Sequence, residues 1–136
     1  MSAGYSGRPL HAKLGFKEGM RAVYVNEPEG FRELLGELPD GVSVTTTLGV
    51  PSDLIVCFTT SRRVFEQRLK ALRRTMTPAG MLWVAWPKKK AAKVETDMTE
   101  DVVREVVLPT GLVDTKVCAI DETWSGLRLV VRKELR

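Results

Sequence analysis

The sequence predicts a single α/β domain with an open, mostly parallel sheet, helices on both faces and an antiparallel hairpin at its C-terminal end. Strand-like runs alternate with amphipathic segments, which is typical of parallel sheets with right-handed crossovers. Two runs, residues 53–60 and 81–87, are apolar on both faces, as expected of strands covered on both sides. Only five residues separate the last two runs, 113–121 and 127–135, and that link suits a hairpin.

Length and composition agree with one ordinary globular domain. The chain has 136 residues, of which 43% are apolar and 28% charged. No apolar run approaches the roughly 20 residues that cross a bilayer, and the first residues lack the apolar core of a secretory signal. We therefore expect a cytoplasmic protein without membrane association. The net charge of +4 permits contact with nucleic acid or other anions without requiring it.

The chain offers few groups for metal or thiol chemistry. Cys57 and Cys118 each lie inside an apolar run, which favours buried thiols in a reducing compartment. The only histidine, His11, falls in or next to a Gly-rich, polar start, so we expect no metal site and no cofactor. Residues 1–12 are predicted to form a flexible arm ahead of a domain that covers residues 13–136.

The first half of the domain is predicted to hold a strand, a helix and a second strand. Residues 20–26 are β-branched and aromatic, which favours a strand. Residues 27–38 carry Pro28 near their start and apolar side chains on one helical face, so a helix is expected there. After a Pro-Asp-Gly turn, the β-branched residues 42–49 predict the next strand.

The middle of the chain holds the clearest helix between the two apolar strands. Residues 61–76 place apolar side chains on one stripe and Arg or Lys on much of the remaining surface. Ser61 is suited to cap this helix at its N-terminus. Residues 88–97 are predicted to be a polar loop, and Thr99 is suited to cap a helix over residues 100–107.

The apolar positions of these elements define an expected core. A strand or helix buries the side chains that face its neighbouring layer, and tryptophan contributes the largest apolar surface. The predicted core comprises Val23, Val25, Leu54, Ile55, Val56, Phe65, Leu69, Leu72, Leu82, Trp83, Val84, Val117 and Val130.

Three stretches carry a resemblance to known proteins: "GMLWVAWPKK", "TEDVVREVVLPTGLVDTKVCAIDETWSGLRLVVRKEL" and, more weakly, "YSGRPLHAKLG". The order of elements is similar to the C-terminal half of the class I S-adenosylmethionine-dependent methyltransferase fold. The three stretches resemble a family of short, uncharacterised bacterial proteins with the outline of that fold. The resemblance covers almost the whole chain and implies a reduced, methyltransferase-like Rossmann fold, with no activity attached to it.

The resemblance stops at the residues that would hold the cofactor. In the methyltransferases the first strand ends in an acid and a glycine-rich turn, whereas this chain reads "YVNEPEGF", with a proline and two glutamates before Gly30. The second strand lacks the acid that would hold the ribose and ends in "TTTLG". We therefore expect a domain without S-adenosylmethionine-dependent catalysis. An enzyme of unknown reaction, including a divergent methyltransferase, stays as the alternative.

Polar residues at the carboxyl ends of the strands form the candidate ligand cleft. In open α/β sheets ligands bind at this edge, and the start of the helix after residue 60 would favour an anion. For Ser61 and Trp86, helix capping and core packing are favoured over a role in ligand binding. The candidates for this cleft are Asn26, Glu27, Thr59, Thr60, Ser61, Trp86 and Lys88.

Basic residues suggest a second kind of partner. Lys88, Lys89 and Lys90 follow the strand at 81–87, and the helix at 61–76 is rich in arginine. Such a run is either a solvated surface or a contact for an anionic partner or nucleic acid. The candidate contacts are the three lysines together with Arg68 and Arg73. Nucleic-acid binding is the less favoured of the two interpretations, because no aromatic residue is interleaved with the arginines.

Overall fold

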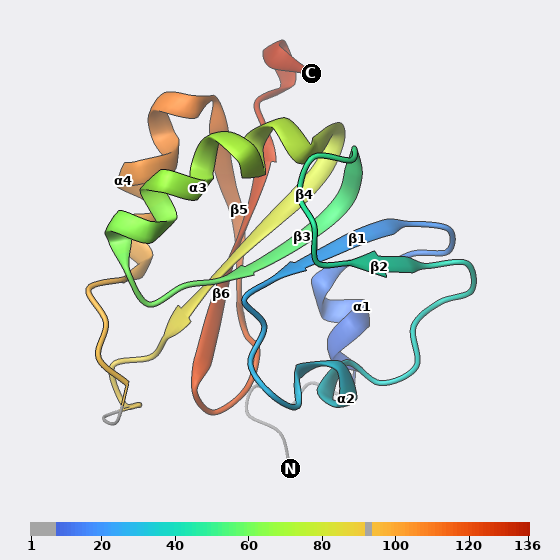
Figure 1. Ribbon diagram of the computed structural model, residues 1–136, viewed down its shortest axis with the longest axis horizontal. Coiled ribbons are helices and arrows are strands. Elements are labelled where there is room, and N and C mark those ends of the chain that lie inside the picture. Colours follow the sequence, from blue (N-terminus) through green and yellow to red (C-terminus); the bar gives the residue numbers. More distant parts are fainter. Residues whose placement is uncertain (1–7, 92–93) are drawn as a thin grey trace.

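The computed structural model describes residues 8–91 and 94–136 and shows one six-stranded sheet between two layers of helices (Figure 1). The sheet has the strand order β2-β1-β3-β4-β6-β5. Its elements are α1 (Leu10–Leu14), β1 (Arg21–Val25), α2 (Phe31–Leu35), β2 (Ser43–Thr45), β3 (Ser52–Phe58), α3 (Arg62–Thr75), β4 (Met76–Pro87), α4 (Glu100–Val107), η1 (Leu108–Thr110), β5 (Leu112–Ala119), β6 (Trp124–Val131) and η2 (Lys133–Leu135).

The topology confirms the predicted fold class. Strand β1 pairs in parallel with β2 and β3, and β3 pairs in parallel with β4. Strand β6 is antiparallel to both β4 and β5, which makes the C-terminal hairpin. Helices α3 and α4 cover one face of the sheet, and α1 and α2 lie on the other (Figure 1). The two strands with apolar residues on both faces, β3 and β4, are central and covered on both sides.

The sheet separates two hydrophobic cores, and alternate residues of each strand belong to one or the other. Val84 faces the core under α3 and α4, whereas Trp83 faces the core under α1 and α2. The Trp83 indole N–H donates to the carbonyl oxygen of Leu14, at 2.8 Å. This bond fastens the end of α1 to the middle of β4, across 69 positions of the sequence.

Both predicted helix caps are present. The Ser61 hydroxyl accepts from the backbone N–H of Val64 at 3.2 Å, and the Thr99 hydroxyl accepts from Val102 at 3.1 Å. These bonds satisfy N–H groups that have no acceptor inside their own helix. The local capping signals therefore located the starts of α3 and α4 correctly.

Two elements of the first half are shorter than predicted. The helix expected over residues 27–38 covers only Phe31–Leu35, because Pro28 lies in a turn before it and Gly30 has a left-handed φ of 87°. The strand expected over residues 42–49 covers only Ser43–Thr45. It lies at the edge of the sheet, and the Thr45 hydroxyl then accepts from Thr47 N in a local turn.

Strand boundaries also differ in the second half. Strand β4 begins at Met76, directly after α3, instead of at residue 81. Strand β6 covers Trp124–Val131 instead of residues 127–135, because Trp124 already pairs with Pro87. The hairpin turn is consequently shorter than expected, and the last residues form η2 instead of continuing the strand.

Two predicted core residues and part of the predicted arm need correction. Val117 is 46% exposed because it lies on the edge strand β5, and Val130 is only partly buried. The arm was expected to extend to residue 12, but residues 10–12 belong to α1 and Leu10 packs on the second core. Residues 1–7 of that arm lie outside the described part of the chain.

Candidate functional site

The carboxyl ends of the parallel strands β1, β3 and β4 reach the same edge of the sheet (Figure 1). This edge is where open α/β sheets bind ligands. The three strand ends differ in how many of their polar groups already form hydrogen bonds or ion pairs within the protein.

The end of β1 is closed by an ion pair. Asn26 adopts a left-handed φ of 58°, and its amide donates to the carbonyl oxygen of Phe58 at 3.4 Å. The Glu27 carboxylate accepts two bonds from Arg32, at 2.8 and 2.9 Å. The Arg32 guanidinium lies 5.3 Å from the centre of the Tyr24 ring, within cation–π range. Asn26 and Glu27 are therefore engaged with their own fold.

The residues that follow β3 form a tight local network. Thr59 is buried, and its hydroxyl both accepts from the backbone N–H of Ser61 at 3.3 Å and donates to the Ser61 carbonyl at 3.1 Å. The Ser61 hydroxyl is used in turn as the cap of α3. These bonds hold the loop after β3 in place at the start of α3. Both bonds of the Thr59 hydroxyl are made to the backbone of Ser61, within the loop itself.

The start of α3 already has an anion beside it. The Asp97 carboxylate accepts from the backbone N–H of Arg62 at 2.7 Å, and the Thr96 hydroxyl donates to the carbonyl of Thr60 at 2.8 Å. A helix N-terminus favours negative charge, and here a carboxylate of the same chain provides it. A cavity of about 430 Å³ lies there, and Glu95 adds a second acidic side chain to its wall.

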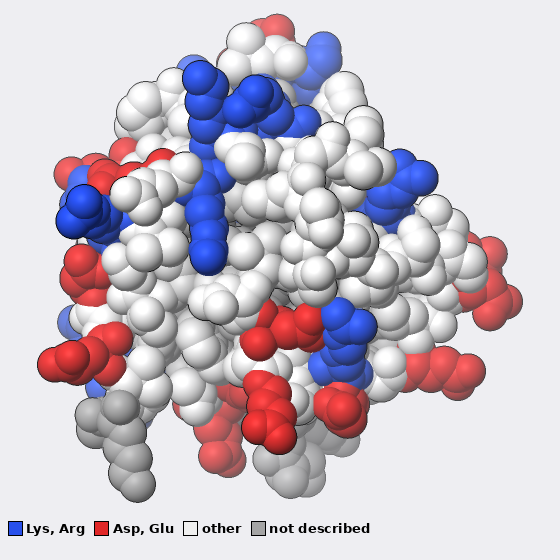
Figure 2. Space-filling model, viewed as in Figure 1, with Lys and Arg blue, Asp and Glu red and all other residues white. Residues whose placement is uncertain are grey.

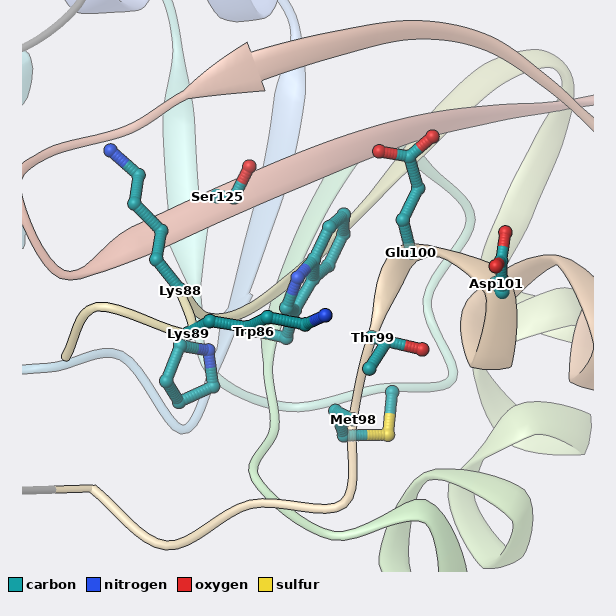
Figure 3. Close-up of a pocket in the computed structure, with 9 residues that line it drawn as sticks. Trp86, Lys88, Lys89, Met98, Thr99, Glu100, Asp101 and Ser125 are labelled. Carbon is teal, nitrogen blue, oxygen red and sulfur yellow. The ribbon is translucent and has the colours of Figure 1, made fainter. Parts of the chain in front are cut away.

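The end of β4 opens into a larger cavity of about 490 Å³ (Figure 3). Trp86 forms part of its wall and is 6% exposed. Within residues 8–91 and 94–136, the Trp86 indole N–H has no hydrogen-bond acceptor. The cavity is lined by Trp86, Pro87, Lys88, Lys89, Met98, Thr99, Glu100, Asp101 and Ser125.

The three lysines after β4 have different positions. The Lys88 ammonium donates to the backbone carbonyl of Asp121 at 2.8 Å, which holds this side chain against the hairpin tip. Lys89 is exposed, and its side chain extends beside the Trp86 indole (Figure 3). Lys90 is exposed as well but does not line this cavity.

The opposite wall of the cavity is the first turn of α4, which carries two acids. Glu100 and Asp101 both form ion pairs with Arg104. The Thr99 hydroxyl accepts from the backbone of α4 and keeps its own proton to donate. The cavity thus has an ammonium group on one side and carboxylates on the other.

The structure brings together only some of the predicted site residues. Trp86, Lys88 and Lys89 share one cavity, whereas Thr60 and Ser61 line a different one. Sequence reasoning missed the contributions of β6, of α4 and of the two residues before α4, which are Met98, Thr99, Glu100, Asp101 and Ser125. The cap at Thr99 was a usable signal for the start of α4, but it contained no information that this helix begins opposite Trp86.

The predicted basic surface on α3 is also partly used by the fold. Arg73 donates to the Thr110 carbonyl at 3.3 Å, and Arg68 is partly buried. Figure 2 shows that Lys and Arg side chains gather over α3, while acidic side chains occupy the opposite edge of the same face. The exposed basic residues of this helix are Arg63, Lys70 and Arg74.

Other reactive groups are few. Burial raises the pKa of the Cys57 thiol to about 12, and burial also raises the pKa of the half-buried Cys118, against the lowering effect of nearby lysines. Among the described residues, no three His, Cys, Asp or Glu side chains are grouped as they would be around a metal ion. Nor does the described part of the chain contain a helix with the length and apolarity to span a membrane.

Comparison with known proteins identifies the fold of the chain but no family model or curated protein that matches it. No family model matches the chain, and no curated protein matches it. Solved structures do match, including a SAM dependent methyltransferase from Aquifex aeolicus at 19% identity, which covers 88% of this chain and 87% of that chain with a TM-score of 0.59. The N-methyltransferase NodS from Bradyrhizobium japonicum WM9 matches at 14% identity, over 91% of both chains, with a TM-score of 0.59.

A third match is a chain of the complex between the Haloferax volcanii Trm112 methyltransferase activator and the putative methyltransferase. Its identity is 11%, its coverage 90% of this chain and 87% of that chain, and its TM-score 0.59. The protein therefore has a methyltransferase-like Rossmann fold. The likeness extends over nearly the whole of these neighbours instead of their C-terminal half alone. At such identities it establishes the fold only, and membership of the short bacterial family stays a prediction.

Proposed function

We propose that this protein is a methyltransferase-like domain that does not carry out S-adenosylmethionine-dependent catalysis and that binds a partner or a small anionic ligand at its strand ends. The observation that supports this most directly is the turn after β1. A cofactor carboxylate placed there would meet Glu27 and Glu29 and would find no N–H at Pro28. The bidentate pair between Glu27 and Arg32 would also have to separate.

The end of β2 supports the same proposal. The residues there are Thr45, Thr46 and Thr47, and the Thr45 hydroxyl is used in a local turn. A threonine side chain is a poor replacement for a carboxylate that accepts from both hydroxyl groups of a ribose, because it has one neutral oxygen instead of two that share a negative charge. The cavity at the end of β4 supports the binding part of the proposal, since Trp86 and Lys89 direct hydrogen-bond donors to it.

Isothermal titration with S-adenosylmethionine and S-adenosylhomocysteine tests the loss of the cofactor site. We expect no saturable heat, and the Aquifex aeolicus methyltransferase serves as the positive control. A dissociation constant at or below about 10 μM, some −7 kcal/mol, would contradict the proposal and favour a divergent methyltransferase. Circular dichroism of the same sample confirms that a negative result comes from folded protein.

Nucleic-acid binding is the second candidate, and the basic side chains over α3 favour it (Figure 2). It is tested by the salt dependence of binding to single-stranded RNA. Three phosphate contacts give a log–log slope of roughly −2, so affinity would fall about 20-fold between 50 and 200 mM salt. Replacing Arg63, Lys70 and Arg74 by alanine should then remove most of this slope, whereas replacing Lys88, Lys89 and Lys90 tests the loop. Absence of binding at low salt rejects this candidate.

A further inference from the structure

Trp86 is a largely buried side chain whose unpartnered indole N–H is accessible from the cavity. Its side chain is 6% exposed, yet in the described part of the chain nothing accepts a hydrogen bond from its indole N–H. The N–H of a buried tryptophan usually has a partner, as Trp83 does in the Leu14 carbonyl. The indole can only donate, so a ligand that bonds to it in the cavity has to offer an acceptor, which takes the place of water.

An acceptor that enters the cavity would also lie near the ammonium group of Lys89. In Figure 3 the Lys89 side chain extends beside the Trp86 indole toward Thr99. Among the described residues Lys89 has no hydrogen bond or ion pair of its own. An indole N–H, an ammonium group and the hydroxyl of Thr99 are three donors, and a carboxylate can accept from several donors at once.

The side of the cavity formed by the start of α4 carries negative charge. In Figure 3 the Glu100 carboxylate lies toward the outer end of the Trp86 side chain, whereas the Lys89 ammonium group lies nearer its base. Its pair with Arg104 is a surface pair, with each side chain 39% exposed, and such pairs contribute only about 0–1 kcal/mol. Glu100 therefore keeps the capacity to accept from a ligand cation. A ligand with only a negative charge would be attracted by Lys89 and repelled by Glu100.

From these observations we infer that the cavity at the end of β4 binds a small zwitterion of the amino-acid class. The ligand carboxylate accepts from Trp86 and Lys89, and the ligand ammonium group donates to Glu100. A compact apolar body packs against the apolar surface that Met98 and Pro87 contribute to the same cavity. This inference rests on the proposed function, because it keeps the binding site at the same strand ends and replaces the plain anion with a ligand whose carboxylate is accompanied by an ammonium group.

Nuclear magnetic resonance of the ¹⁵N-labelled full chain tests the inference, because each tryptophan has its own indole N–H signal. The Trp86→Phe variant identifies the Trp86 signal, and the Trp83 signal serves as the internal control. Three probes share one apolar body: L-leucine, 4-methylpentanoate, which lacks the ammonium group, and 3-methylbutylamine, which lacks the carboxylate. We expect L-leucine to move the Trp86 signal saturably, and the other two to bind about tenfold more weakly or less, since each lacks one charge-assisted bond.

Single substitutions test the contributions of Lys89 and Glu100 separately. Lys89→Met should weaken L-leucine about tenfold and leave the affinity for 3-methylbutylamine unchanged or tighter, because that probe has no carboxylate and carries the same charge as Lys89. Glu100→Gln should weaken L-leucine similarly and leave 4-methylpentanoate unchanged or tighter. Lys116→Met is the matched control, since Lys116 is an exposed lysine of β5 that does not line the cavity.

The inference is overturned if neither L-leucine nor glycine moves the Trp86 signal at roughly tens of millimolar, where binding energies are only about −2 to −3 kcal/mol. It is also overturned if 4-methylpentanoate binds as tightly as L-leucine and Glu100→Gln has no effect. That second result would leave the proposed function intact with a plain anion as its ligand. Failure of the proposed function is seen separately, as tight S-adenosylmethionine binding in the calorimeter.

Discussion

Replacing Trp83 by alanine should remove a large part of the stability of this domain. Trp83 is fully buried in the centre of β4, and its indole N–H bonds to Leu14 at 2.8 Å. A buried aromatic side chain removes about 150–250 Å² from water, which corresponds to about 4–6 kcal/mol at 25 cal/mol per Å². Measured costs of Trp→Ala changes are about 3–5 kcal/mol, against a total stability of about 5–15 kcal/mol.

Urea unfolding followed by circular dichroism measures this loss without relying on tryptophan fluorescence. We expect the free energy of unfolding to fall by about 3–5 kcal/mol and the melting temperature to fall by roughly 10–20 °C. Val117→Ala is the matched control, because Val117 is 46% exposed and its truncation should cost about 0.5 kcal/mol or less. A Trp83→Ala protein that melts within about a degree of the parent would show that the reasoning is wrong.

Trp83→Phe separates packing from hydrogen bonding. It keeps most of the ring but leaves the Leu14 carbonyl without its donor, which should cost about 1–3 kcal/mol. Because that bond fastens α1 to the sheet, amide hydrogen exchange in α1 should accelerate more than exchange in α3. Equal protection of α1 in the variant and the parent would mean that packing alone holds this helix.

Three further predictions concern single groups. Gly126→Ala should lower stability by about 1–3 kcal/mol in urea unfolding, because a Cβ there would lie 3.1 Å from the ring of Trp83; an unchanged midpoint would show that the ring can move aside. Burial raises the pKa of Tyr24 from 10.0 to about 12, so its stabilising contribution is complete below pH 10 and is lost as pH rises to about 12. An absorbance titration in which all tyrosine ionises near pH 10, before unfolding, would contradict this. A disulfide reagent at pH 8 should modify Cys118 before Cys57, whose pKa of about 12 and full burial protect it, and Cys118→Ser should abolish the early reaction.

The fold was predictable because its signals are local or repeat along the chain. Apolar residues on both faces placed β3 and β4 in the centre of the sheet, and the cap at Ser61 located α3. The extents of α2 and β2 were not predictable, because Gly30 and the position of β2 at the edge of the sheet end these elements early. The prediction that Val117 is buried was wrong for a related reason, because the apolar character of a residue does not reveal whether its strand lies at the edge of the sheet.

The site was only partly predictable, because its decisive contacts are distant in sequence. The rule that ligands bind at strand ends selected Trp86, Lys88 and Lys89, which do share a cavity. The same rule selected Ser61 as part of an anion site, but it could not show that Asp97, 35 positions after Arg62, supplies the carboxylate to α3. Which helix start faces which strand end depends on the path of the intervening loop.

The three strand ends together explain why we place binding at β4. A buried or clustered polar group is costly unless it has a partner, so the groups that lack partners mark where a ligand can add free energy. At β1 the partner of Glu27 is Arg32, and at β3 the partner of the helix start is Asp97. A ligand at either place must first displace a charge-assisted bond and can gain only the difference. At β4 an acceptor that bonds to the indole of Trp86 displaces water and no bond of the described residues, and the pair of Glu100 with Arg104 is an exposed surface pair that contributes little.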